Sequence, residues 1–225
     1  MMKKRILFAI LLCILLPVFA GALEKGDQVC FGVYEQDNDT ENGKEPIEWI
    51  VIDQDEESVE LITVYGIDAR QYHKKYEPVT WAGCSLRTWL NEDFLNAAFT
   101  EEEKSVLLRT VIVTDDNSTF HTLGGEQTED FVFILSAGEL KSLVTPAAKR
   151  QIRPTPYAIE NNAYAMTRGK TKGNCWWWVR MPGNEQDTAA YVKDDGTIFY
   201  KGIDVDFFSV AIRPVIRISQ DYFNQ

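Results

Sequence analysis

Three consecutive tryptophans, Trp176 to Trp178, constrain the fold of this chain more than any other feature of its sequence. The segment 174–183 around them has the composition of a β-strand. Successive side chains of a strand point to opposite faces, so Trp176 and Trp178 share one face with Arg180 and the middle indole points to the other. Because tryptophan is highly buried on average, other parts of the chain must cover both faces. Either all three indoles belong to the core, or one or two of them line a groove that stacks on sugar rings or peptide side chains.

Strand patterns occupy both ends of the chain. Residues 28–34 alternate between apolar and polar side chains, and the β-branched runs 47–52 and 59–65 flank a charged turn, which predicts a hairpin. The triplet Asp194-Asp195-Gly196 predicts a tight turn. Further strand candidates are 111–113, 131–135, 175–179, 189–192, 197–200 and 210–218.

Helical patterns lie between these strands. Apolar side chains recur every three or four residues over 86–98, which predicts an amphipathic helix capped by Ser85. Capping boxes predict the starts of two more helices, at Thr100 with Glu103 and at Ser136 with Glu139. Strands at both ends and helices in the middle, without an internal repeat or a linker, predict a single α+β domain.

The first residues have the pattern of a secretory signal peptide. Basic residues 3–5 precede the apolar run 6–19, and Ala20-Gly21-Ala22 offers the small side chains at which signal peptidase cuts. An uncleaved anchor is the alternative, but the apolar run is shorter than the roughly 20 residues that span a bilayer. We therefore expect residues 1–22 to be removed. Residues 23–225 then form one secreted or cell-envelope domain without stable membrane insertion.

Charge limits the partners of this domain. The chain has 34 acidic and 23 basic side chains and a formal charge of -11, so a nucleic acid or an anionic membrane would be repelled. The composition is otherwise that of an ordinary globular protein, with 45% hydrophobic residues. We expect no nucleic-acid partner.

An acidic loop near the first strand offers oxygen ligands. Asp37, Asp39, Glu41 and Glu48 fall at the first, third, fifth and twelfth places of a calcium-loop count. The sixth place, which needs glycine, holds Asn42. A solvated acidic loop explains these residues equally well. We expect no cofactor, with calcium as the alternative.

Arg180 and Arg213 both lie beside apolar strand residues. A buried arginine is usually tied to a carboxylate or to backbone carbonyls, so a structural role is favoured over an anion clamp for a carboxylate or sugar acid. The chain shows no serine-hydrolase, metalloprotease, phosphate-binding or dinucleotide motif. Catalysis by paired carboxylates is the enzymatic alternative, but no acidic pair is singled out among so many.

Short segments spread over the chain resemble, in order and spacing, the bacterial family of domains of unknown function called DUF6273. These segments are Phe31-Gly32-Val33-Tyr34, Glu45-Pro46-Ile47-Glu48-Trp49, residues 80–91, the tryptophan run with Arg180 and Pro182-Gly183, Ala190-Tyr191-Val192 with Asp195-Gly196, and Ile212-Arg213-Pro214. The resemblance covers roughly residues 26–218 and departs from the family pattern at Met181, where the family favours serine.

The resemblance implies no activity. The family's layout is similar to that of C-type-lectin-like and formylglycine-generating-enzyme-like domains, which implies a C-type-lectin-like mixed sheet with helices in the middle of the chain. The calcium-binding triplets of sugar-binding lectins and the cysteine pair of the formylglycine enzymes are absent from the corresponding places. Neither activity is therefore implied here, because a fold does not carry a function with it.

The chain is rich in aromatic residues and shows no group of residues typical of a catalytic site. We therefore expect an exported, non-catalytic binding module for a glycan, another cell-envelope component or a peptide. An enzyme that acts on cell-envelope polymers through carboxylates, or a structural or assembly protein, is the alternative. The predicted ligand-binding residues are Trp176, Trp178, Arg180, Tyr191, Tyr200 and Arg213.

Removal of the signal peptide leaves three cysteines, Cys30, Cys84 and Cys175, and three ways to pair two of them. Cys84 and Cys175 both adjoin the family-like segments. The resemblance therefore favours a disulfide between these two and a free thiol at Cys30.

Overall fold

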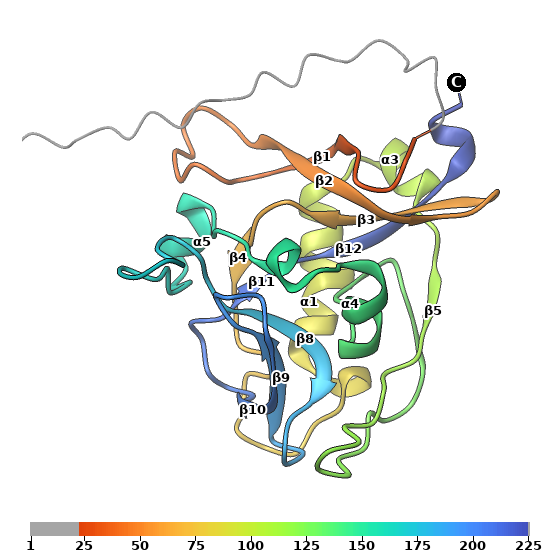
Figure 1. The fold of residues 1–225 in the computed structure, drawn as a ribbon. Coiled ribbons are helices and arrows are strands. Elements are labelled where there is room, and N and C mark those ends of the chain that lie inside the picture. The colour runs from red at the N-terminus through yellow and green to blue at the C-terminus, as the bar shows by residue number, and fades with distance from the viewer. Residues whose placement is uncertain (1–22, 225) are drawn as a thin grey trace, which may run out of the picture.

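The computed structural model describes residues 23–224, so the predicted signal peptide lies outside the described residues. Two five-stranded sheets and a two-stranded ribbon lie alongside one long helix (Figure 1). The strands are β1 (Gln28–Tyr34), β2 (Glu45–Gln54), β3 (Ser58–Thr63), β4 (Asp68–Ala69), β5 (Thr110–Ile112), β6 (Thr128–Asp130), β7 (Val132–Phe133), β8 (Trp177–Pro182), β9 (Thr188–Val192), β10 (Ile198–Asp204), β11 (Ala211–Ile212) and β12 (Val215–Ser219). The helices are η1 (Trp81–Gly83), α1 (Ser85–Trp89), η2 (Leu90–Phe94), α2 (Leu95–Ala98), α3 (Glu101–Val106), α4 (Ala137–Leu143), η3 (Ala147–Arg150), α5 (Pro156–Glu160) and η4 (Gln220–Tyr222).

The first sheet has the strand order β1-β2-β3-β12-β7, and all its pairs are antiparallel. The predicted hairpin of β2 and β3 is confirmed, with Trp49 opposite Thr63. Every residue of β3 is buried because the strand has a neighbour on each side and is covered on its faces.

The second sheet has the order β10-β9-β8-β11-β4 and places the tryptophan-rich strand β8 at its centre. β8 pairs antiparallel with β9 and parallel with β11. The chain passes between the two sheets four times, from β3 to β4, from β4 by way of the helices and the ribbon to β7, from β7 to β8 and from β11 to β12. One hydrophobic core includes residues of both sheets and of the helices. The prediction of a single α+β domain is confirmed.

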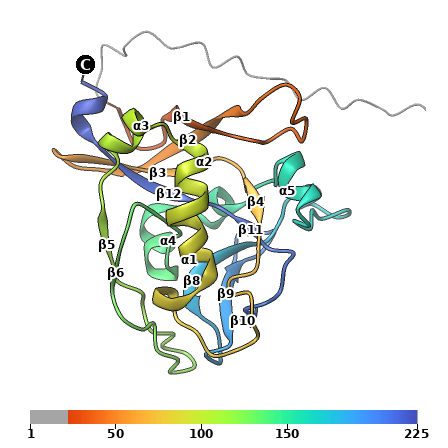
Figure 2. The ribbon, with the colours of Figure 1, turned by 180° about the vertical axis from the view of Figure 1, so that it is seen from behind.

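Residues 85–98 form the predicted long helix, which runs alongside both sheets (Figure 2). Its middle turn, η2, is a π-helix between α1 and α2. The predicted cap is one residue off: Cys84 is the N-cap, and its Sγ accepts a hydrogen bond from the Arg87 N–H at 3.4 Å. Ser85 instead accepts a hydrogen bond from the backbone of Lys74 at 2.9 Å.

Both predicted capping boxes are confirmed. Thr100 and Glu103 cap α3, and Ser136 and Glu139 cap α4. None of the helices in the described part of the chain combines the length and the apolarity needed to cross a membrane.

Candidate functional site

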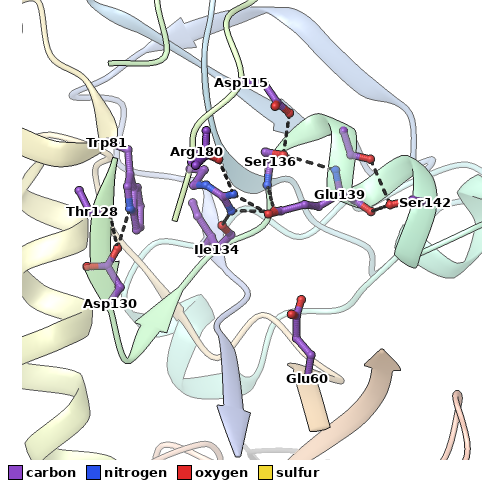
Figure 3. Close-up of polar contacts among 12 residues, drawn as sticks. Glu60, Trp81, Asp115, Thr128, Asp130, Ile134, Ser136, Glu139, Ser142 and Arg180 are labelled. Atoms are coloured by element: carbon purple, nitrogen blue, oxygen red, sulfur yellow. Dashed lines mark hydrogen bonds and ion pairs between the residues drawn. The ribbon is translucent and has the colours of Figure 1, made fainter. Parts of the chain in front are cut away.

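Arg180 lies at the C-terminal end of β8 and is buried, with 1% of its surface exposed. Its guanidinium donates two hydrogen bonds to the Glu139 carboxylate, from Nη1 at 2.7 Å and from Nη2 at 2.6 Å (Figure 3). It also donates to the carbonyls of Ile134 at 2.6 Å and Val113 at 2.9 Å. Arg180 therefore ties β8 to α4 and to two further segments, and it is not exposed to a ligand as the sequence-based assignment required.

Glu139 takes part both in the cap of α4 and in the ion pair with Arg180. Its Oε2 accepts the Ser136 N–H at 2.7 Å in the capping box of α4, and the same carboxylate forms the bidentate pair with Arg180. Ser136 in turn donates its hydroxyl to Asp115 at 2.9 Å. The Glu139 carboxylate therefore caps α4 and is at the same time the counter-ion of Arg180, which is far away in the sequence.

Arg213 is equally buried, at the point where the chain crosses from β11 to β12. Its Nε donates to the Thr63 carbonyl at 2.8 Å, and its guanidinium lies 5.1 Å from the centre of the Trp177 ring. Burial lowers the pKa of Arg213 to about 9. Arg213 fastens the passage from β11 to β12 to the end of β3, where the chain leaves for β4, so the predicted ligand contact is wrong for this residue as well.

Two of the three indoles belong to the core. Trp177 and Trp178 are fully buried. Their Nε1 atoms donate to the carbonyls of Arg150 at 3.0 Å and Arg70 at 2.8 Å, so each ring has its polar atom satisfied. Trp178 is also covered by the ring of Tyr72, 5.7 Å away. It cannot line a groove in this structure, and its assignment to a ligand surface is wrong.

The N-terminal end of β8 is open. Trp176, just before the strand, is half-buried, and its ring centre lies 4.9 Å from that of Tyr191 in β9. Tyr191 lies 5.4 Å from Phe199 in β10, which is 38% exposed. Tyr191 itself is buried between the other two, with 5% of its surface exposed, so this predicted ligand-binding residue supports the row and offers little surface of its own. These three rings, here called the aromatic row, cross three neighbouring strands on one face.

A polar rim borders the aromatic row. Asp194 accepts a hydrogen bond from Trp176 Nε1 at 3.1 Å and another from the Thr171 hydroxyl at 2.5 Å. The predicted tight turn holds Asp194 in place: Gly196 has a φ of +83°, a conformation that favours glycine, and its N–H bonds the Lys193 carbonyl at 2.9 Å. Burial, and secondarily the Asp194 charge, raise the pKa of Tyr191.

Tyr200 does not join the row. It follows Phe199 in β10 and so points to the other face of the strand. There the ammonium of Lys141 in α4 lies 5.0 Å from its ring centre. Phe199, which the sequence analysis did not single out, takes the place expected of Tyr200. Its position directly opposite Tyr191 follows from the register of β9 and β10.

The acidic loop does not assemble the predicted calcium ligands. The carboxylates that approach one another, within 4.8 Å, are those of Glu35, Asp37 and Glu45, of which only Asp37 belongs to the predicted set. Backbone N–H groups already occupy two of them: Glu45 accepts from Gln36 at 2.7 Å, and Asp37 accepts from Asp39 at 2.8 Å. The loop is thus held by its own side chains.

Cys84 and Cys175 are both free and buried, so the predicted disulfide between them is wrong. Cys84 caps α1, whereas Cys175 lies beside Gly66, just before β8. Both cysteines adjoin the family-like segments in the sequence, but the fold does not bring them together. Burial raises the pKa of each thiol to about 12. Cys30 is disulfide-bonded in the structure, against the expectation of a free thiol.

A model of the family described as "Domain of unknown function (DUF6273)" matches residues 54–220. The match contains all four passages between the sheets and the whole second sheet, and it leaves out β1 and most of β2. No curated protein and no solved structure matched the chain. The similarity in layout to C-type-lectin-like domains therefore stays a prediction.

Proposed function

The chain belongs to the DUF6273 family, whose description names no activity, and we propose that it is an exported, non-catalytic module that binds a glycan on the aromatic row. The observation that carries this proposal is the arrangement of Trp176, Tyr191 and Phe199 as neighbouring rings at the open end of β8. Apolar faces of sugar rings pack on such aromatic surfaces, and a few polar groups beside them fix orientation.

The rim chemistry selects among ligands that stack on rings. Single-stranded nucleic acids also stack on aromatic side chains. Asp194 borders the row, however, and the chain carries a charge of -11, so a polyanion would be repelled. The Asp194 carboxylate accepts hydrogen bonds from Trp176 and Thr171, and its backbone carbonyl accepts one from Asn174. The remaining lone pairs of the carboxylate suit ligand hydroxyl groups. A neutral, hydroxyl-rich ligand matches this surface better than a polyanion.

The test is an array of glycans and soluble peptidoglycan fragments, probed with the mature protein and with two variants. Phe199→Ala removes one exposed ring and should weaken binding about tenfold. Tyr222→Ala is the matched control, since Tyr222 is exposed to nearly the same extent, 39%, and follows a strand of the other sheet. If wild type retains no glycan, or if both variants bind equally well, the proposal is wrong.

A further inference from the structure

A second candidate surface lies at the other edge of the second sheet. A pocket of about 200 Å³ opens between the end of β4, the long helix and the residues after α5. The aromatic row includes a residue of β10, whereas this pocket borders β4, and these two strands are the opposite edges of the sheet. Its lining includes Arg70, Lys74, Trp89, Asp93, Asn161 and Phe208.

Arg70 is held in one orientation within this lining. Its Nε donates to Asp68 Oδ2 at 3.3 Å, and its guanidinium carbon lies 4.2 Å from the centre of the Trp89 ring. The side chain is 39% exposed. Among the described residues, neither Nη atom of Arg70 donates a hydrogen bond. The planar pair of Nη donors, which matches a carboxylate, is therefore available to a ligand.

Asp68 holds the side chains of Arg70 and Asn161 at the pocket. Its carboxylate is fully buried and accepts hydrogen bonds from the Tyr34 hydroxyl at 2.9 Å, the Ala69 N–H at 2.7 Å and the Asn161 side chain at 2.9 Å. Burial and the Asp68 charge raise the pKa of Tyr34 far above its ordinary value, so Tyr34 remains a donor. Asp68 thus holds Arg70 and Asn161 side by side at the pocket without occupying the Nη pair.

The charges around the pocket favour a ligand with a single negative charge. Arg70 and Lys74 are positive, and Asp68 and Asp93 are negative, so their formal charges cancel. A phosphate dianion would find no excess of positive charge here, whereas a carboxylate needs only the directed Nη pair. The exposed ring of Phe208 and the Trp89 ring border the pocket and suit an apolar part of the ligand.

We infer that this pocket binds the carboxylate of a small ligand, with Arg70 as the bidentate donor and Asp68 as the residue that positions it. A uronic acid and an N-acylated amino acid share this chemistry. The inference is independent of the aromatic row, and variants of the row leave this pocket intact.

The test is a titration of the mature protein followed by NMR, in which the indole signal of Trp89 and the side-chain amide signal of Asn161 are monitored. Three probes are compared: glucuronate, N-acetylalanine and inorganic phosphate. We expect saturable shifts with at least one carboxylate, and the stronger one identifies the source. Phosphate should bind more weakly than that carboxylate.

The variant Arg70→Lys keeps the charge and loses the planar donor pair, and it should bind the carboxylate at least about tenfold more weakly. The matched control is Arg109→Lys: Arg109 also lies over a ring, that of Phe131 at 5.1 Å, and beside an acid, Glu129 at 3.7 Å. The inference is overturned if neither carboxylate gives a saturable shift, if phosphate binds most tightly, or if Arg70→Lys binds like wild type. The wild-type titration decides even where a variant fails to fold.

Discussion

At the C-terminal end of β8, Arg180 uses both Nη atoms on Glu139 and two backbone carbonyls and is hidden from solvent. At the other end of the same strand, Trp176 keeps part of its ring in solvent and has a neighbouring ring on the next strand. The two ends are covered differently: α4 packs against the Arg180 end, whereas the Trp176 indole at the other end is bordered by the turn at Asp194 and stays partly exposed. A single strand therefore contributes to the core at one end and to a binding surface at the other.

The largest expected effect distinguishes the buried indole from the open one. Trp178→Ala should lower the free energy of unfolding by about 3–5 kcal/mol, because it empties a fully buried site and leaves the Arg70 carbonyl without its donor. Trp176→Ala should cost only about 1 kcal/mol, since part of this ring is already exposed to solvent. Urea unfolding of both variants measures the difference. Equal losses would contradict the division of β8 into a closed and an open end.

The next effect tests the closed end alone. Glu139→Gln removes the counter-ion of buried Arg180 and should cost about 2–3 kcal/mol. This loss of stability is at or below the lower end of the range for breaking a buried ion pair, because the Glu139 side chain is 34% exposed. Glu102→Gln, in the exposed first turn of α3, is the control and should change stability little. If both variants lost similar amounts of unfolding free energy, the ion pair of Glu139 with Arg180 would contribute no more to stability than an exposed surface charge does.

The smallest effect concerns a buried acid in the first sheet. Burial raises the pKa of Glu60 above its ordinary value of 4.5, although Arg217 donates to it at 2.6 Å. The folded protein therefore holds this proton more tightly than the unfolded chain does. That contribution to stability is complete below pH 4.5 and is lost as the pH rises through the raised pKa.

Glu60→Gln removes this pH dependence. Relative to wild type, the variant should gain stability as the pH rises from about 4 to 7, as measured by urea unfolding at several pH values. Asp221→Asn, at an exposed acid near the end of the same sheet, serves as the control. A constant difference between Glu60→Gln and wild type across this range would contradict the raised pKa.

Local patterns were predictable from the sequence, and long-range partners were not. The capping boxes at Thr100 and Ser136 were recognised because their residues are three apart. The ion pair of Arg180 was missed because Glu139 is 41 positions away in the sequence. The capping box already explained the Glu139 carboxylate, so nothing in the sequence indicated a second partner. The two free thiols were paired wrongly because similar motif context says nothing of distance.

The candidate site was only partly predictable. Alternation along β8 correctly put Trp176 and Trp178 on one face, but only the packing of Tyr72 shows which of them is covered. Phe199 enters the row through the register of β10 on β9, which a single strand pattern does not fix. Arg70 was not singled out at all, because its partners Asp68, Trp89 and Asn161 come from three separate elements.

The most direct test of the binding surface follows the indole N–H signals of all six tryptophans by NMR while a soluble peptidoglycan fragment or another retained glycan is added. We predict that the Trp176 signal shifts saturably, together with ring signals of Phe199, while the signals of Trp177 and Trp178 stay nearly unchanged. A bound glycan that leaves Trp176 unmoved would contradict the account.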